Sequence, residues 1–234
     1  MELLELNLVS TLSGVAAVLF VLFVRLHWPF RFQYISAIFK RNPERSMYWL
    51  DCSYRRNRTR SVAALDKSTS EIMAGRYEEA ERYIAEGLNI CKNDPTIFHQ
   101  SMVHYLFYNL AALYLHRGRT QEALELAFRV YERDHSLVQV LAIMVCAHAR
   151  IGDVQGALEA FQVMVKKKIN PELKLYCLAE LEAAKGNMDL AAQYLRKVLA
   201  MRFPAILYLT RQQIEQQLEE WTKASPRVDM LPFK

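Results

Sequence analysis

Four glycines, each followed five residues later by an alanine, constrain the fold of this chain more than any other feature. The glycines are Gly75, Gly118, Gly152 and Gly186, and the alanines are Ala80, Ala123, Ala157 and Ala191. A glycine at the end of a helix can adopt the left-handed conformation with which the chain turns back. An alanine early in the next helix lets two helix axes approach to about 8–10 Å. The pattern therefore predicts a helical hairpin that is repeated four times, in an all-α fold.

The residues around each glycine have the apolar spacing of one-sided helices. Before Gly118, apolar residues recur at intervals of three and four positions, and they are Phe107, Leu110, Ala111 and Tyr114. Equivalent positions precede Gly152 and Gly186, and apolar positions also recur nine and twelve residues after each glycine. Both helices of each hairpin are thus expected to bury one face.

The 34-residue interval between successive glycines in the last two repeats resembles the tetratricopeptide repeat (TPR), whose 34-residue unit has an apolar residue, a Leu-small pair, an aromatic, a glycine turn and an alanine. Residues 108–118 are the closest match, and the resemblance covers roughly residues 61–204. The first repeat departs from the pattern, because Lys67 and Ser68 stand where leucine and a small residue are usual. This resemblance implies an α-solenoid of about four hairpins that binds proteins, although a fold does not specify a ligand.

The spacing also predicts an irregularity between the first two hairpins. Gly75 and Gly118 are 43 residues apart, about nine more than the later interval. These extra residues lie around positions 93–101, where they lengthen the connection or a neighbouring helix.

A membrane anchor is expected at the N-terminus. Residues 8–24 contain no charge, and with Leu6 and Asn7 the run reaches the lower length limit for crossing a bilayer. The start carries Glu2 and Glu5 rather than the basic residues of a signal peptide. We therefore interpret residues 1–24 as a transmembrane helix, with a buried core helix as the alternative.

A basic, aromatic-rich segment, residues 25–60, follows the apolar run. It holds nine Lys or Arg residues against Glu44 and Asp51, while residues 1–24 carry −2 and the rest of the chain is neutral. By the positive-inside rule the N-terminus is translocated and the repeats stay cytoplasmic. We expect a bacterial inner membrane in preference to a mitochondrial outer membrane.

The same segment is expected to contact anionic lipid head groups. The candidate membrane-surface residues are Arg25, Trp28, Arg31, Phe32, Lys40, Arg41, Arg55, Arg56 and Arg58. Phe32, Ile35 and Phe39 share one helical face, which is consistent with an interfacial helix or with aromatic packing on the first repeat. A nucleic-acid partner is not expected, because the charge lies beside the apolar run and not on the repeats.

A concave surface formed by the first helix of each repeat is the expected binding site for a protein partner. The candidate groove residues are Tyr105, Tyr108, Ala112, His116, Gln139, Cys146, Arg150, Tyr176 and Glu180. A tyrosine-lined groove suits an extended peptide or an amphipathic helix. The alternative is that Tyr105 and Tyr108 make internal contacts.

Neither an enzyme nor a cofactor or metal site is predicted. The six histidines are scattered without a ligand spacing, and no phosphate-binding glycine loop occurs. The four cysteines, Cys52, Cys91, Cys146 and Cys177, show no paired spacing, so neither a disulfide framework nor a zinc site is indicated.

The C-terminal residues complete the expected organisation. Residues 205–224 are expected to form an amphipathic helix that caps the solenoid, and residues 225–234 an extended tail. The chain is thus interpreted as a membrane-anchored TPR adaptor that assembles or regulates a membrane complex. A structural subunit held through its transmembrane helix and a receptor for targeting peptides are the alternatives. The sequence does not specify the oligomeric state.

Overall fold

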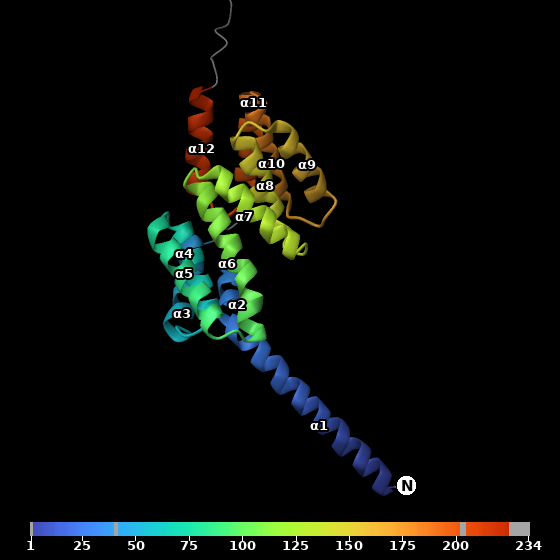
Figure 1. Ribbon diagram of the computed structural model, residues 1–234. Coiled ribbons are helices and arrows are strands. Elements are labelled where there is room, and N and C mark those ends of the chain that lie inside the picture. Colours follow the sequence, from blue (N-terminus) through green and yellow to red (C-terminus); the bar gives the residue numbers. More distant parts are fainter. Residues whose placement is uncertain (1, 40–41, 202–204, 225–234) are drawn as a thin grey trace, which may run out of the picture.

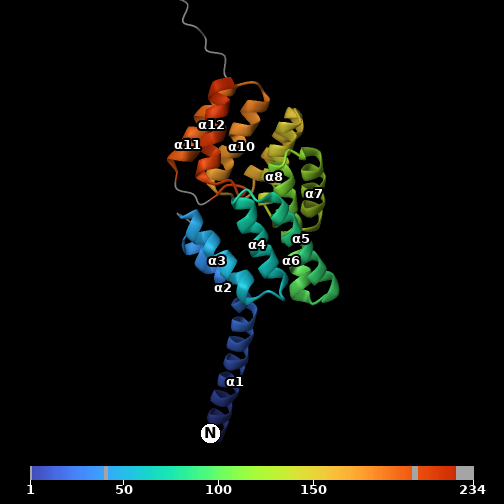
Figure 2. The same ribbon diagram turned by 90° about the vertical axis from the view of Figure 1, so that its left-hand side faces the viewer.

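The computed structural model describes residues 2–39, 42–201 and 205–224, and within these ranges the chain is all-α (Figure 1). The helices are α1 (Glu2–His27), the 3₁₀ turn η1 (Trp28–Phe30), α2 (Arg31–Ile38), α3 (Pro43–Arg56), α4 (Ser61–Met73), α5 (Tyr77–Asn93), α6 (Ile97–His116), α7 (Thr120–Arg133), α8 (Gln139–Arg150), α9 (Val154–Val165), α10 (Pro171–Ala184), α11 (Met188–Ala200) and α12 (Arg211–Ala224). The pairs α4–α5, α6–α7, α8–α9 and α10–α11 are the four expected hairpins. They stack from the end at which α1 leaves towards α12 (Figure 2).

The turn between the two helices of each hairpin confirms the role of the glycines. Gly75, Gly118, Gly152 and Gly186 have φ of +73°, +74°, +83° and +82°. In each turn the residue after the glycine donates its amide to the carbonyl five positions back, at 2.9 Å. This bond closes a Schellman cap, which needs the left-handed residue that glycine supplies. The four alanines, Ala80, Ala123, Ala157 and Ala191, are completely buried at the helix crossings.

The additional residues between Gly75 and Gly118 lengthen two helices. α5 has 17 residues and α6 has 20, whereas α7, α8 and α9 have 14, 12 and 12. The two long helices therefore extend past the rest of the solenoid, towards the end from which α1 leaves (Figure 1).

Helices α2 and α3 form a further hairpin that precedes the first repeat. The Asn42 side chain caps α3 by accepting the Arg45 amide at 3.1 Å, and Pro43 occupies the first helical turn. Phe32 of α2 and Leu50 of α3 are buried, and α3 packs along α4. Part of residues 25–60 thus belongs to the folded domain.

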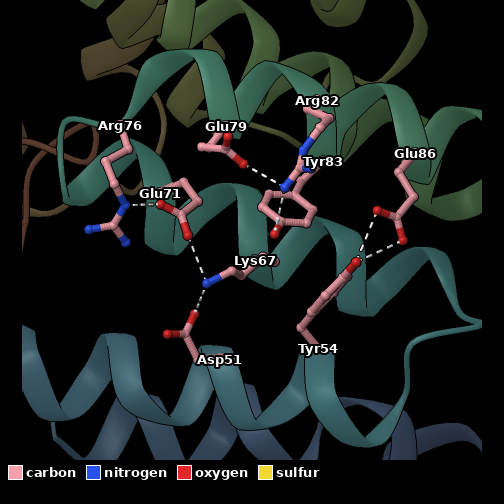
Figure 3. Close-up of polar contacts among 9 residues, drawn as sticks. All are labelled: Asp51, Tyr54, Lys67, Glu71, Arg76, Glu79, Arg82, Tyr83 and Glu86. Carbon is pink, nitrogen blue, oxygen red and sulfur yellow. Dashed lines mark hydrogen bonds and ion pairs between the residues drawn. The ribbon is translucent and has the colours of Figure 1, made fainter.

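A polar network joins α3 to the first repeat (Figure 3). Lys67 Nζ lies 2.9 Å from Asp51 Oδ1 of α3 and 2.7 Å from Glu71 Oε1. Tyr54 of α3 donates its hydroxyl to Glu86 of α5, at 3.0 and 3.1 Å from the two carboxylate oxygens. Lys67 departs from the TPR pattern because this position faces a charged residue of the preceding hairpin.

Helix α1 stands apart from the domain. Its described apolar side chains, from Leu12 to Val24, are exposed, and Figure 1 shows it projecting away from the remaining helices. By length and composition, the stretch Ser10–Ile38 includes a window apolar enough to cross a bilayer, with mean hydropathy 1.7, and no part of that window is buried in the domain.

Candidate functional site

The inner surface of the solenoid, which α4, α6, α8 and α10 line, is covered by the chain's own C-terminal segment. We use the name C-terminal segment for residues 205–224. Within it Ile206, Leu207 and Ile214 are buried at 2%, 6% and 0% exposure. The capping helix predicted over residues 205–224 begins only at Arg211 as α12, because Leu207 and Tyr208 form a tight turn in which the main chains of Ile206 and Leu209 hydrogen-bond to each other at 2.9 and 3.0 Å. The C-terminal segment therefore lies on the surface that the sequence predicts as an open groove.

Tyr208 fixes the turn of this segment to the second hairpin. Its hydroxyl donates to Asn109 Oδ1 at 2.6 Å, and its ring meets the Tyr108 ring edge-on at 5.7 Å. Asn109 in turn donates to Ser68 Oγ at 2.8 Å and Thr69 Oγ1 at 3.0 Å on α4. Leu207 and Tyr208 have φ of 48° and 67°, a backbone conformation that costs non-glycine residues free energy. The hydrogen bonds and burial on the inner surface offset this strain.

His116 holds the main chain of the same segment. Its Nε2 lies 2.6 Å from the Leu207 carbonyl oxygen, so the neutral ring with the proton on Nε2 is the donor. Burial lowers the pKa of His116 to about 4, despite the opposing effect of this hydrogen bond. The ring is therefore neutral at physiological pH.

A buried ion pair connects α8, α10 and α12. Arg150 Nη2 lies 2.7 Å from Glu180 Oε1, and Arg150 also donates from Nη1 to the Leu115 carbonyl at 3.1 Å. Tyr176 and Gln217 of α12 donate to the same Glu180 oxygen at 2.8 and 3.0 Å. Burial opposes ionisation of Glu180, but the Arg150 charge and these three donors outweigh it and lower its pKa. Glu180 is only 4% exposed, so its negative charge is neutralised inside the chain.

The predicted groove residues fall into two groups. The buried group is Tyr108, Ala112, Cys146, Tyr176 and Glu180. The expectation that Ala112, Cys146 and Tyr176 are exposed in a groove is wrong, whereas Glu180 is buried but lines the cleft described below. For Tyr108 the alternative of an internal contact holds, because the ring packs against Tyr208. Tyr105 and Gln139 are exposed, and His116 and Arg150 are partly exposed. The inner surface also includes Asn109, Tyr208 and Gln217, which were not predicted because no spacing marks them.

A cleft of about 580 Å³ remains open beside α12. Its inner wall includes His116, Arg150 and Glu180, and its outer wall includes Gln213, Gln216, Gln217 and Trp221 of α12. Amide side chains both donate and accept hydrogen bonds, as an extended peptide backbone requires. This cleft is one accessible part of the inner surface.

The predicted membrane-surface residues lie at the end of the domain where α1 leaves. Trp28, Arg55, Arg56 and Arg58 are exposed there, and Arg31 is half-buried. Phe32 is 5% exposed and lies against Trp49, so its prediction as a lipid contact is wrong and the packing alternative holds for it. Lys40 and Arg41 lie outside the described residues, as do the side chain of Arg25 and the predicted tail 225–234.

The part of the chain that the structure describes contains no cluster of side chains suited to binding a metal ion. No group of three or more His, Cys, Asp or Glu side chains there is placed to hold an ion. The four cysteines are free thiols, and Cys91, Cys146 and Cys177 are buried.

Comparison with solved structures defines the class of fold. A crystal structure of a thermophilic TPR protein in Thermus thermophilus superposes with a TM-score of 0.52 at 14% identity, covering 85% of this chain and 99% of that one. YrrB, a TPR protein with an unusual peptide-binding site, aligns with a TM-score of 0.43 at 16% identity over 82% of this chain and 88% of its own. No protein-family profile and no curated protein matches the sequence. The chain therefore has a TPR fold, as the hairpin spacing predicts.

Proposed function

We propose that this chain is a membrane-tethered, non-enzymatic TPR scaffold that binds an extended segment of a protein partner in the cleft beside α12. The observation that carries the proposal is the cleft itself, which three glutamine side chains, Arg150 and Trp221 line. The neighbouring inner surface already holds a tight turn of this chain, through a side-chain hydrogen bond from His116 to its main chain. A partner segment makes the same type of contact there. Binding at a membrane suits the assembly or regulation of a membrane complex.

Membrane tethering is the second part of this proposal. The apolar α1 side chains from Leu12 to Val24 are exposed, and α1 contacts the domain at its C-terminal end, through η1 and through the His27 ring that stacks on Tyr34 of α2. Such a helix lowers its free energy by leaving water for hydrocarbon. The basic residues that follow favour the cytoplasmic side for the repeats.

Site-specific photo-crosslinking in intact cells tests the binding site. A photoreactive amino acid at Gln216, inside the cleft, is expected to capture a defined protein. The same group at Glu132, on the exposed side of α7, is the matched control and is expected not to capture it. Replacement of Trp221 by alanine is expected to abolish capture from position 216. Equal adducts from both positions would contradict the assignment of the cleft.

A structural subunit held through α1 is the second candidate function. A methyl group added at Gly14 would meet no atom of the chain within 4 Å, so a neighbouring membrane helix can approach closely there. A photoreactive group at Val18 of α1 distinguishes the two functions. Capture of membrane proteins from Val18 but not from Gln216 favours the structural subunit. In either case, a chain that lacks residues 2–24 is expected to be extracted from membranes by alkaline carbonate.

A further inference from the structure

Five arginines at the end where α1 leaves are not neutralised by the chain. They are Arg31, Arg55, Arg56, Arg58 and Arg60, and within the described ranges none of them forms an ion pair with a carboxylate. By contrast, Arg76, Arg117, Arg119, Arg150 and Arg211 all pair with glutamates. Burial and the positive charges of Arg56 and Arg60 lower the pKa of Arg31. The arginines thus repel one another. This repulsion raises the electrostatic free energy of the chain, and an anionic partner would remove it.

The fold holds these cations in place. Arg31 Nη2 donates to Asn57 Oδ1 of the α3–α4 turn at 3.4 Å, which ties α2 to the segment that carries Arg58 and Arg60. The Arg31 guanidinium lies 4.7 Å from the centre of the Trp28 ring and 4.4 Å from that of Phe32. Arg58 lies 5.8 Å from the Tyr54 ring. The positive charges therefore form an ordered cluster on one end of the domain.

An exposed isoleucine from a distant part of the sequence joins this cluster. Ile97, the first residue of α6, is 92% exposed. The neighbouring Phe98 ring lies 5.7 Å from the Phe30 ring of η1, which brings the α5–α6 turn beside the end of α1. Both ribbon views place this turn and the α3–α4 turn at the end of the domain from which α1 projects (Figures 1 and 2). The one acidic residue of the α5–α6 turn, Asp94, faces His99 at 3.3 Å.

We propose that these residues form a basal surface that docks on anionic phospholipid head groups. The basal surface consists of Trp28, Arg31, Arg55, Arg56, Arg58, Arg60 and Ile97. Its arginines bind lipid phosphates, and Trp28 and Ile97 enter the interfacial layer, where amphipathic and apolar side chains are favoured. The inference rests on the proposed membrane tether and adds that the repeat domain is held against the bilayer in one orientation. The inner surface then faces sideways at a set height above the membrane.

A spin label reports this docking directly. The full chain carries Cys52→Ser, to remove the one thiol that is not buried, and Asn93→Cys for a nitroxide in the basal region. In nanodiscs that contain phosphatidylglycerol, collisions of this label with a water-soluble nickel complex are expected to fall at least threefold relative to phosphatidylcholine nanodiscs. A label at Glu132→Cys on α7 is expected to respond equally in both lipids. Equal accessibility at position 93 in the two lipids would overturn the proposal.

Matched variants distinguish the effect of the basal arginines from the effect of net charge. The triple variant Arg55→Gln, Arg56→Gln and Arg60→Gln is expected to lose the protection by phosphatidylglycerol. Arg129→Gln, Arg133→Gln and Arg196→Gln remove the same charge from exposed positions of α7 and α11 and are expected to keep it. Loss in both triple variants would overturn the proposal. Ile97→Ser is expected to reduce the protection at constant charge.

Two further measurements distinguish the failure of docking from other outcomes. If alkaline carbonate extracts the full chain from membranes, the tether itself is absent and the proposed function fails with it. A chain that resists extraction but shows no lipid-dependent protection refutes docking alone. Polyuridylate that binds the chain in phosphatidylcholine nanodiscs with the same variant dependence would assign the basal surface to nucleic acid and overturn the proposal.

Discussion

The inner surface and the basal surface differ in whether their charged side chains are paired within the chain. On the inner surface, Arg150 and Glu180 neutralise each other and Gln217 completes their hydrogen bonds. On the basal surface, the charges of Arg56 and Arg60 lower the pKa of Arg31, and none of the three pairs with a carboxylate among the described residues. Buried charges in proteins are paired, whereas an exposed cluster of one sign is attracted to a partner of opposite charge. The inner surface therefore stabilises the fold, and the basal surface is available for a partner outside the chain.

The N-terminal hairpin and the C-terminal segment are attached to the repeats by groups whose pKa values are shifted in opposite directions. Asp66 of α4 accepts from Gln33 of α2 at 2.5 Å and so joins the N-terminal hairpin to the repeats. Burial raises its pKa to about 7, against the hydrogen bond from Gln33 that favours the anion. His116, which holds the C-terminal segment, has its pKa lowered by burial. One attachment is thus strongest when protonated and the other when deprotonated.

The largest expected effect is on the inner surface. Arg150→Met leaves the Glu180 carboxylate buried without its cation and is expected to lower the free energy of unfolding by about 4 kcal/mol. Denaturant unfolding followed by circular dichroism measures this change. Arg133→Met on the exposed side of α7 is the control and is expected to stay within about 0.5 kcal/mol of wild type. Similar stabilities for both variants would break the contrast between paired and unpaired arginines.

Asp66→Asn is expected to have the next largest effect, and its sign depends on pH. The folded pKa of Asp66 is raised to about 7, so folding takes up a proton and the contribution of Asp66 is complete below its unfolded pKa of about 3.9. That contribution, about 4 kcal/mol at about 1.4 kcal/mol per pKa unit, is lost as the pH rises through 7. The asparagine variant keeps the neutral side chain at every pH. Its stability relative to wild type is therefore expected to increase between pH 4 and pH 7, as measured by denaturant unfolding at each pH.

His116→Gln is expected to show the opposite pH dependence with a smaller amplitude. Because the folded pKa of His116 is lowered to about 4, folding releases a proton between that value and the unfolded pKa of about 6.5. The stability contributed by His116 is present above about pH 6.5 and is lost as the pH falls towards 4, by about 3 kcal/mol. Glutamine can still donate to the Leu207 carbonyl but does not titrate. A variant that loses stability on acidification as steeply as wild type would show that His116 does not attach the C-terminal segment.

Arg56→Gln is expected to have the smallest effect on the fold. Its side chain is exposed and has no carboxylate partner among the described residues, so the free energy of unfolding is expected to change by less than about 0.5 kcal/mol. Thermal unfolding in detergent, with Arg133→Gln as the control, measures this difference. A loss above about 1 kcal/mol would show that the basal arginines support the fold, which would remove the distinction between the two surfaces.

The regular part of the fold could be predicted because its signals are local. A glycine that must adopt positive φ and an alanine at a close helix crossing act within a few residues, so Gly152 and Ala157 mark their hairpin without knowledge of the rest. The departure at Lys67 was visible in the sequence but had no explanation there. Its partner Asp51 belongs to a hairpin whose residues the charge pattern indicated only as a juxtamembrane segment.

The candidate site could be predicted only in outline. The spacing placed Tyr108, Tyr176 and Glu180 on the inner faces of their helices, but it could not show that the chain itself covers them. Tyr208 reaches Asn109 across 99 residues of sequence, and residues 205–210 have no helical or strand period that predicts where they lie. The place of Ile97 on the basal surface could not be predicted either, because an isolated exposed isoleucine belongs to no sequence pattern.

The four hairpins, the apolar helix at the N-terminus and the excess of basic residues after it are all encoded locally along the chain. These features follow from local backbone preferences, hydrophobic periodicity and composition. Which charges are neutralised and which surface is open became clear from the folded arrangement alone. Those outcomes depend on side chains that meet across long stretches of chain, as Arg150 meets Glu180 and Arg31 meets the α3–α4 turn. A residue's identity states its charge, and the packing around it decides whether a partner must come from outside.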